Sequence, residues 1–296
     1  MSPHTQHPHA PTRTQRDTGD TRGNAATATA ASTFRPDIQG IRAIAVGAVV
    51  LNHLIAWPTG GFVGVDVFFV VSGFLITGLL LRERERTGRI SMRQFFTRRI
   101  RRIMPAAAVT IAVTTALGFL ILSPTRAQAT LGDGLFASIF LANWRFAAGG
   151  TDYFASDMGT SPLQHFWTLS VEEQFYLVWP WMLIATLAIA AAAASRAGKT
   201  IATTTQRRIL AAVLIPIVAA SLIWSTVETA TAPSVAYFAT ASRIWELGAG
   251  ALLAVGAGLF ANLTTRARLT LAITGLAGIL GSMVLLTEQT PFPGPF

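Results

Sequence analysis

The sequence predicts an all-α integral membrane protein: a polytopic helical bundle of about seven spans with one re-entrant or partial helix. Of its 296 residues, 51% are hydrophobic and only 12% are charged. A soluble domain carries about a quarter charged residues, so most of this chain is expected to face lipid, where charge is costly. From Asp37 onward, apolar segments alternate with short polar ones, and each is close to the roughly 20 residues that cross about 30 Å of hydrocarbon.

The charge balance fits the same class. The net charge is +9, and all but Lys199 of the 23 basic residues are Arg. In a soluble protein this would indicate nucleic acid, but here the Arg residues fall between apolar segments and are explained by orientation in the bilayer. No nucleic-acid partner is expected. The chain has no cysteine and lacks zinc-type spacings, a P-loop or a dinucleotide fingerprint, so no bound metal or cofactor is expected.

Two regions are expected. Residues 1–33 have no apolar run and no helical period, which predicts a disordered cytoplasmic tail rather than a signal peptide. Residues 34–296 form the membrane domain. Its predicted spans are residues 38–57, 62–81, 104–122, 174–194, 209–227, 243–261 and 269–287.

Basic segments predict the orientation in the plasma membrane. They are residues 1–35, 82–103, 195–208 and 262–268, and the second carries nine Arg. If residues 130–142 form a partial or re-entrant helix on the outer side, all four basic segments are predicted to be cytoplasmic. The amino terminus is then cytoplasmic too. The polar segment 143–168 is then outside. The carboxyl end is also outside after an odd number of spans, so we expect the membrane domain to be incomplete there.

The first span holds two ionisable residues. Arg42 and His53 are eleven residues apart, which returns them to nearly the same helix face about 16 Å apart. Ionisable groups inside a span usually line a polar cavity. Arg42 could also be an anchor that reaches the inner head groups, and His53 could instead make a hydrogen bond between helices.

The turn at 57–61 makes the first two spans an antiparallel hairpin. Asp66 and His53 are similarly far from this turn, so Asp66 is a candidate group to orient His53 and raise its basicity. It could equally cap the second span. The pair Ser72-Gly73 is interpreted as a close helix contact rather than a nucleophile, because no base partner is evident.

Two further segments combine charge with aromatic residues. Apolar residues recur at helical spacing around Arg93–Arg102, which predicts an interfacial amphipathic helix. Its Arg side suits phosphates or serves only as a positive-inside anchor. The segment from His165 to Tyr176 contains Glu172 and Glu173; Glu172 and Tyr176 share a helix face. A helix amino terminus with an aromatic belt is the alternative interpretation.

The later span opens with Arg243 and Glu246, three residues apart, which predicts a structural ion pair. Behind them, small residues at Gly250, Ala254 and Gly258 predict close helix packing.

Five of these strings, in order, resemble the acyltransferase-3 family of bacterial membrane O-acyltransferases. They are Phe34–Arg42 followed by His53, Gly64–Phe74, the paired Arg of 98–102, His165–Tyr176, and Arg243–Gly248. The resemblance runs from about residue 34 to the end of the sequence. Members of the family usually have about three more spans, and some add an esterase-like SGNH domain; neither is present in this sequence.

The resemblance implies a donor, an acceptor and roles. The donor is a cytoplasmic acyl-CoA, most simply acetyl-CoA, and the acceptor is an outer hydroxyl of a glycan, peptidoglycan or glycolipid. His53 is then the base or a transient acyl carrier, and Glu173 and Tyr176 complete the catalytic site with Asp66. The residues implied in substrate binding are Arg42, Arg98, Arg99, Arg101, Arg102 and Glu172.

Two other functions stay open at this point. A transporter or flippase component would be expected to show an inverted repeat, and the sequence has no evident internal repeat. An inactive, truncated fragment is suggested by the abrupt end of the sequence. The acyl group, the acceptor and the oligomeric state are not determined by these residues.

Overall fold

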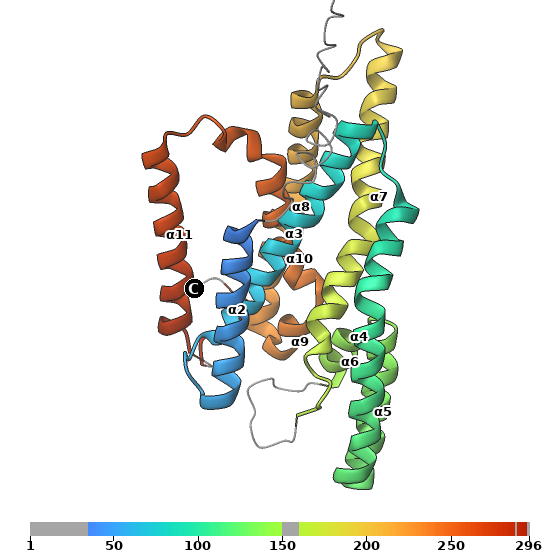
Figure 1. Cartoon of the computed structure of the whole chain (residues 1–296), viewed down its shortest axis with the longest axis vertical. Helices are drawn as coiled ribbons and strands as arrows, with labels where there is room; N and C mark the ends of the chain where they lie inside the picture. Colours follow the sequence, from blue (N-terminus) through green and yellow to red (C-terminus); the bar gives the residue numbers. More distant parts are fainter. Residues whose placement is uncertain (1–34, 150–159, 288, 295–296) are drawn as a thin grey trace, which may run out of the picture. The chain divides into compact units, whose positions relative to one another are not determined.

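The structure is a computed structural model that describes residues 35–149, 160–287 and 289–294. The described residues form helices joined by short turns, without a β-strand (Figure 1). The helices are α2 (Pro36–Ile55), η1 (Gly61–Val63), α3 (Gly64–Thr87), α4 (Met92–Ile121), α5 (Pro124–Ser138), α6 (Ala142–Gly149), α7 (Phe166–Arg196), α8 (Thr203–Thr231), α9 (Pro233–Phe238), α10 (Thr240–Val255), η2 (Ala257–Phe260) and α11 (Thr265–Leu285). Contacts divide the chain into two units, residues 1–39 and 40–296.

The described helices confirm a polytopic all-α membrane protein. Six of them are long and apolar enough to cross a membrane: α2, η1 with α3, α4, α7, α8 and α11. Their outer faces expose large apolar side chains, such as Leu54 at 74% and Leu120 at 80%. The charged Arg243 and Glu246, in contrast, have 0% exposure. Apolar residues outside and charges inside are the arrangement that a lipid solvent favours.

Within the second unit, the basic connections gather at one end of the helices. The turns at 88–91, 197–202 and 256–264 lie at this end, and the α2–α3 turn and α9 lie at the other (Figure 1). This arrangement agrees with the predicted alternation of sides. Which end faces the cytoplasm stays a prediction, and the predicted tail at 1–33 lies outside the described residues.

Three predicted elements differ in extent. Residues 92–121 form one helix of 30 residues with Pro105 inside it, so the expected interfacial helix continues directly into the third span. The fourth span begins at Phe166 rather than at residue 174. The segment predicted as a sixth span, 243–261, overlaps the 16-residue α10, which begins earlier, at Thr240, and ends at Val255. At 1.5 Å per residue α10 is about 24 Å long, and its buried residues place it in the core.

The partial helix expected at 130–142 corresponds to two short helices, and its location on the outer side stays a prediction. Helix α5 ends at Ser138 and α6 begins at Ala142. Phe140, between them, has a positive φ of 57°. This break keeps both helices too short to be spans, and α5 packs back along α4.

The hairpin between α2 and α3 is present as predicted. The Asn52 side chain donates to the carbonyl oxygen of Pro58, 3.0 Å away, and closes the turn. A Cβ atom on Gly61 or Gly64 would lie 2.5 Å from a carbonyl oxygen of α2. Only glycine allows the two helices to approach this closely.

Helices α3 and α10 cross at direct backbone contact. A Cβ atom on Gly73 would lie 1.8 Å from the Leu247 carbonyl oxygen, and one on Gly250 would lie 1.9 Å from that of Val70. The predicted small-residue contact is therefore present at Gly250. It does not extend to Gly258, which follows the end of α10 and where an added Cβ atom would meet nothing within 4 Å.

Next to this crossing, Arg243 is fully buried and bound on several sides. It donates to Asp66 at 2.8 Å, to Glu246 at 2.9 Å and to the carbonyl oxygen of Tyr237 at 3.0 Å. The ring of Phe292 lies 4.7 Å from its guanidinium carbon. The predicted pair of Arg243 and Glu246 thus belongs to a larger network that joins α3 to α10.

The crossing generates a stability prediction. Gly73→Ala must force α3 and α10 apart, so we expect a loss of at least the ~1–3 kcal/mol typical of overpacking. Gly278→Ala is the matched control, because nothing lies within 4 Å of the added Cβ atom and alanine favours a helix over glycine by about 1 kcal/mol. Thermal unfolding of the purified protein in detergent measures both. Equal midpoints for the two variants would contradict the crossing.

Candidate functional site

A cavity of about 470 Å³ opens among α2, α3, α4 and α7. Its walls combine apolar side chains with an unusual number of charged and polar ones. The polar lining residues are Arg42, Ser72, Arg98, Arg99, Arg102, Glu172 and Tyr176. Four arginines and one glutamate leave the cavity strongly positive, which suits an anionic ligand.

Arg99 is held on two sides. Its Nη2 atom donates to Glu173 at 2.6 Å, and its guanidinium lies 3.5 Å from the centre of the Tyr176 ring. These contacts fix the start of α4 against α7, because an ion pair and a cation–π contact act on one side chain. Arg98 lies 3.8 Å from Glu83 and is about half exposed.

The inner wall of the cavity joins α3 to α7. The Ser72 hydroxyl donates to Glu172 at 2.7 Å. A smaller cavity of about 210 Å³ shares Leu169 and Glu172 with the first and extends to Thr168. Val65, Phe68 and Phe69 of α3 complete this smaller cavity, so its walls are mostly apolar.

His53 meets a second histidine at that amino terminus. The ring centres of His53 and His165 are 4.9 Å apart, with an angle of 71° between the ring planes. His53 Nδ1 lies 2.8 Å from the Val49 carbonyl oxygen. A carbonyl only accepts, so Nδ1 carries the hydrogen and the lone pair of a neutral His53 is on Nε2.

The protein also acts on the charge state of His165. Desolvation lowers the pKa of His165 below its ordinary value, and the neighbouring His53 lowers it further. A lowered pKa means that the folded protein binds this proton less readily. His165 is therefore mostly neutral at pH 7, because its pKa lies below the ordinary value of about 6.5.

The predicted site residues separate into groups. Six line the cavity: Arg42, Arg98, Arg99, Arg102, Glu172 and Tyr176. Glu173 accepts a hydrogen bond from Arg99 but does not line the cavity. Arg101 is exposed and does not line it either. Asp66 accepts from Arg243, and a carbonyl, that of Val49, holds His53 Nδ1. The catalytic and binding roles of all these residues stay predictions.

Two residues were not selected from the sequence. His165 belongs to the segment that carries the resemblance, and only the fold shows that it meets His53. Ser72 was assigned to packing because no base partner is evident in the sequence; its partner Glu172 is one hundred residues away. In both cases the available signal was a polar residue within a short motif, without any indication of its partner.

The fold and the cavity define a polytopic helical membrane protein with a strongly basic interior site. Residues 35–294 match the family model described as an acyltransferase domain, so the chain belongs to the acyltransferase-3 family. No solved structure matches the chain.

Curated relatives are similar over three quarters of the chain. The peptidoglycan O-acetyltransferase OatA of Listeria monocytogenes is 35% identical over 224 residues, which are 75% of this chain and 34% of that protein. The putative peptidoglycan O-acetyltransferase YrhL of Bacillus subtilis is 35% identical over 225 residues, 75% of this chain and 33% of the relative. The chain thus spans about a third of the length of these relatives.

The histidine pair predicts a titration. In NMR spectra of the protein labelled at histidine, we expect the His165 ring to titrate below a pH of about 6.5. His53→Gln should raise this midpoint toward the ordinary value without reaching it, since desolvation remains. The signal that disappears in the His165→Gln variant is assigned to the His165 ring. A wild-type midpoint at or above the ordinary value, or no response to His53→Gln, would contradict the pairing.

Proposed function

We propose that this protein is a membrane O-acyltransferase that moves an acetyl group from acetyl-CoA to a hydroxyl of peptidoglycan or a similar envelope glycan. The observation that carries the proposal is the basic cavity, which α7 lines, together with the pair of His53 and His165 at the start of the same helix. The names of the relatives support the acetyl group and the peptidoglycan acceptor.

The donor would enter from the end where the basic connections gather. Arginine binds phosphate oxygens through a planar, bidentate fork, and Arg98 and Arg102 line the cavity at the start of α4. The apolar walls, including Leu75 and Leu79, suit the less polar arm of CoA. In CoA, this arm lies between the phosphates and the thioester. In the protein, Arg42 and His53 are likewise separated, by about 16 Å along α2.

His53 would carry the proton chemistry. With its hydrogen on Nδ1, Nε2 can take the proton of the acceptor hydroxyl as that oxygen attacks the thioester carbonyl. The new ester C–O bond forms, the C–S bond breaks, and the leaving CoA thiolate takes up a proton. In the alternative order, Nε2 attacks first, carries the acetyl group and passes it to the acceptor oxygen.

His165 would support His53 rather than compete with it. Because the pKa of His165 is lowered, its ring is neutral at pH 7 and does not repel a proton that His53 acquires. Its edge-to-face position also limits the rotation of the His53 ring at the exposed end of α2.

The donor site generates a matched pair of variants. We expect Arg102→Lys to weaken binding of CoA to the purified protein about tenfold, since it keeps the charge but loses the bidentate fork. Arg101→Lys, next in the chain but outside the cavity lining, should bind as wild type. Calorimetry measures both affinities. Equal CoA binding by the two variants would mean that the arginines of 98–102 serve only to orient the protein in the membrane.

The chemistry generates a prediction for the two histidines. His53→Gln keeps a hydrogen-bonding side chain but removes the basic nitrogen, so acetyl transfer should fall by about 10²–10⁴-fold at normal protein level. His165→Gln should reduce the rate less, because the proposed role of His165 is to position the neighbouring His53 ring. Transfer of labelled acetyl groups to cell-wall glycan measures both. A near wild-type rate for His53→Gln would exclude His53 as base and as carrier.

A further inference from the structure

Ser72 has the only polar side chain that α3, which is described in full, contributes to the basic cavity. The other lining residues of this helix are apolar: Val71, Leu75, Ile76 and Leu79. Ser72, Leu75 and Leu79 follow one another at three- and four-residue spacing, so they share one face of the helix. The rotation of this face is fixed, because Gly73 is in direct backbone contact with α10. Ser72 is thus a hydroxyl beside the apolar stripe of Leu75 and Leu79, about 10 Å along the helix axis from Leu79.

The hydrogen of the Ser72 hydroxyl is committed to Glu172. The Oγ atom lies 2.7 Å from Glu172 Oε1 and donates to it. A hydroxyl has a single hydrogen and keeps its lone pairs, and a carboxylate only accepts. The pair of Ser72 and Glu172 therefore presents hydrogen-bond acceptors to the cavity and no donor.

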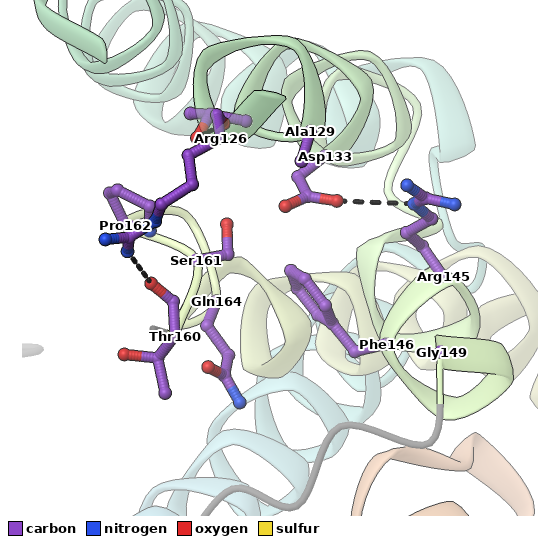
Figure 2. Close-up of a pocket in the computed structure, with 11 residues that line it drawn as sticks. Arg126, Ala129, Asp133, Arg145, Phe146, Gly149, Thr160, Ser161, Pro162 and Gln164 are labelled. Carbon is purple, nitrogen blue, oxygen red and sulfur yellow. Dashed lines mark hydrogen bonds and ion pairs between the residues drawn. The ribbon is translucent and has the colours of Figure 1, made fainter. Parts of the chain in front are cut away.

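Glu172 does not serve to neutralise an arginine. Its neighbour Glu173 accepts from Arg99 at 2.6 Å. In a separate cavity of about 230 Å³, among α5, α6 and the segment before α7, Asp133 likewise accepts from Arg145, at 3.3 Å (Figure 2). Glu172 lines a cavity with four arginines, yet among the described residues it forms no ion pair. An acid at this position needs another explanation.

The pair lies deeper in the cavity than the arginines at its opening. Arg98 and Arg102 are exposed, whereas Ser72 and Glu172 are half-buried. The cavity thus has hydrogen-bond donors at its mouth and acceptors further in, with the apolar stripe of α3 on the same wall. A complementary ligand has an anionic end, an apolar arm and an N–H group along that arm.

We propose that Ser72 and Glu172 select the donor by accepting a hydrogen bond from an amide N–H of its arm. This inference rests on the proposed function and adds two specificity-determining residues to the same donor site. The arm of CoA contains amide groups. A donor with phosphates on a hydrocarbon chain, such as a polyprenyl phosphate, has no N–H group. It would leave both acceptors unpaired in a cavity that has lost its water, and this weakens binding.

Binding to the full chain in lipid nanodiscs tests this selection without requiring acetyl transfer. The probes are CoA and phosphoadenosine diphosphate, which is the nucleotide of CoA without the arm. We expect the wild type to bind CoA at least about tenfold more tightly, since the arm adds apolar contact and a hydrogen bond. Ser72→Ala should weaken CoA binding about fivefold and leave binding of the nucleotide unchanged. A purely structural role of Ser72 would change both affinities alike.

Three further variants use the ratio of the two affinities as the readout. Ser72→Thr keeps the hydroxyl and should retain the wild-type ratio. Glu172→Gln removes a charge that repels both anionic probes, but the ratio should fall, because a neutral oxygen is a weaker acceptor than a carboxylate. Ser282→Ala is the matched control and should retain the ratio. It removes a half-buried hydroxyl of α11 that lies outside the cavity and donates to the Ile279 carbonyl oxygen.

The outcomes separate this inference from the proposed function. The inference alone is overturned if the wild type binds both probes equally, if Ser72→Ala keeps the wild-type ratio, or if Ser72→Ala weakens both probes alike. If the wild type binds neither probe, the proposed donor is wrong, and the proposed function is refuted together with this inference.

Discussion

The buried Arg243 network is the constraint on which the rest of the structure depends. A guanidinium with 0% exposure cannot be left unpaired in a low-dielectric interior. Glu246 of the same helix pairs with it, and α10 must also lie where Asp66 of α3 can reach it. The same guanidinium contacts the Trp167 ring, 5.3 Å away. Trp167 is two residues from His165, so this network also positions the start of α7 and, through it, the histidine pair.

Helix α7 is the element that links the two proposed halves of the site. Glu172 and Tyr176 face the basic cavity, and His165, about two turns earlier, faces α2. Buried contacts such as the bond from Trp179 to Thr77, at 2.8 Å, hold the helix against α3. A rigid helix with different chemistry at its two levels suits a reaction whose donor and acceptor lie on opposite sides of a membrane.

The positions of the arginines at the start of α4 can be explained in the same way, by what each guanidinium contacts. At the start of α4, the arginines would serve both the predicted orientation and the proposed donor site. Arg102 lines the cavity and Arg101 does not, so the two uses can be separated.

The sequence by itself determined the properties that depend on local composition: the membrane environment, the approximate spans, the α2–α3 hairpin and the five strings that identify the family. It did not determine which residues meet, because a helix turns by about 100° per residue and small shifts decide the face each side chain occupies. Only the tertiary structure showed that His165 contacts His53, that Asp66 pairs with Arg243 and that Arg101 does not line the cavity. It also buried α10 in the core, since hydropathy reports that a segment avoids water but does not tell lipid from protein as its surroundings.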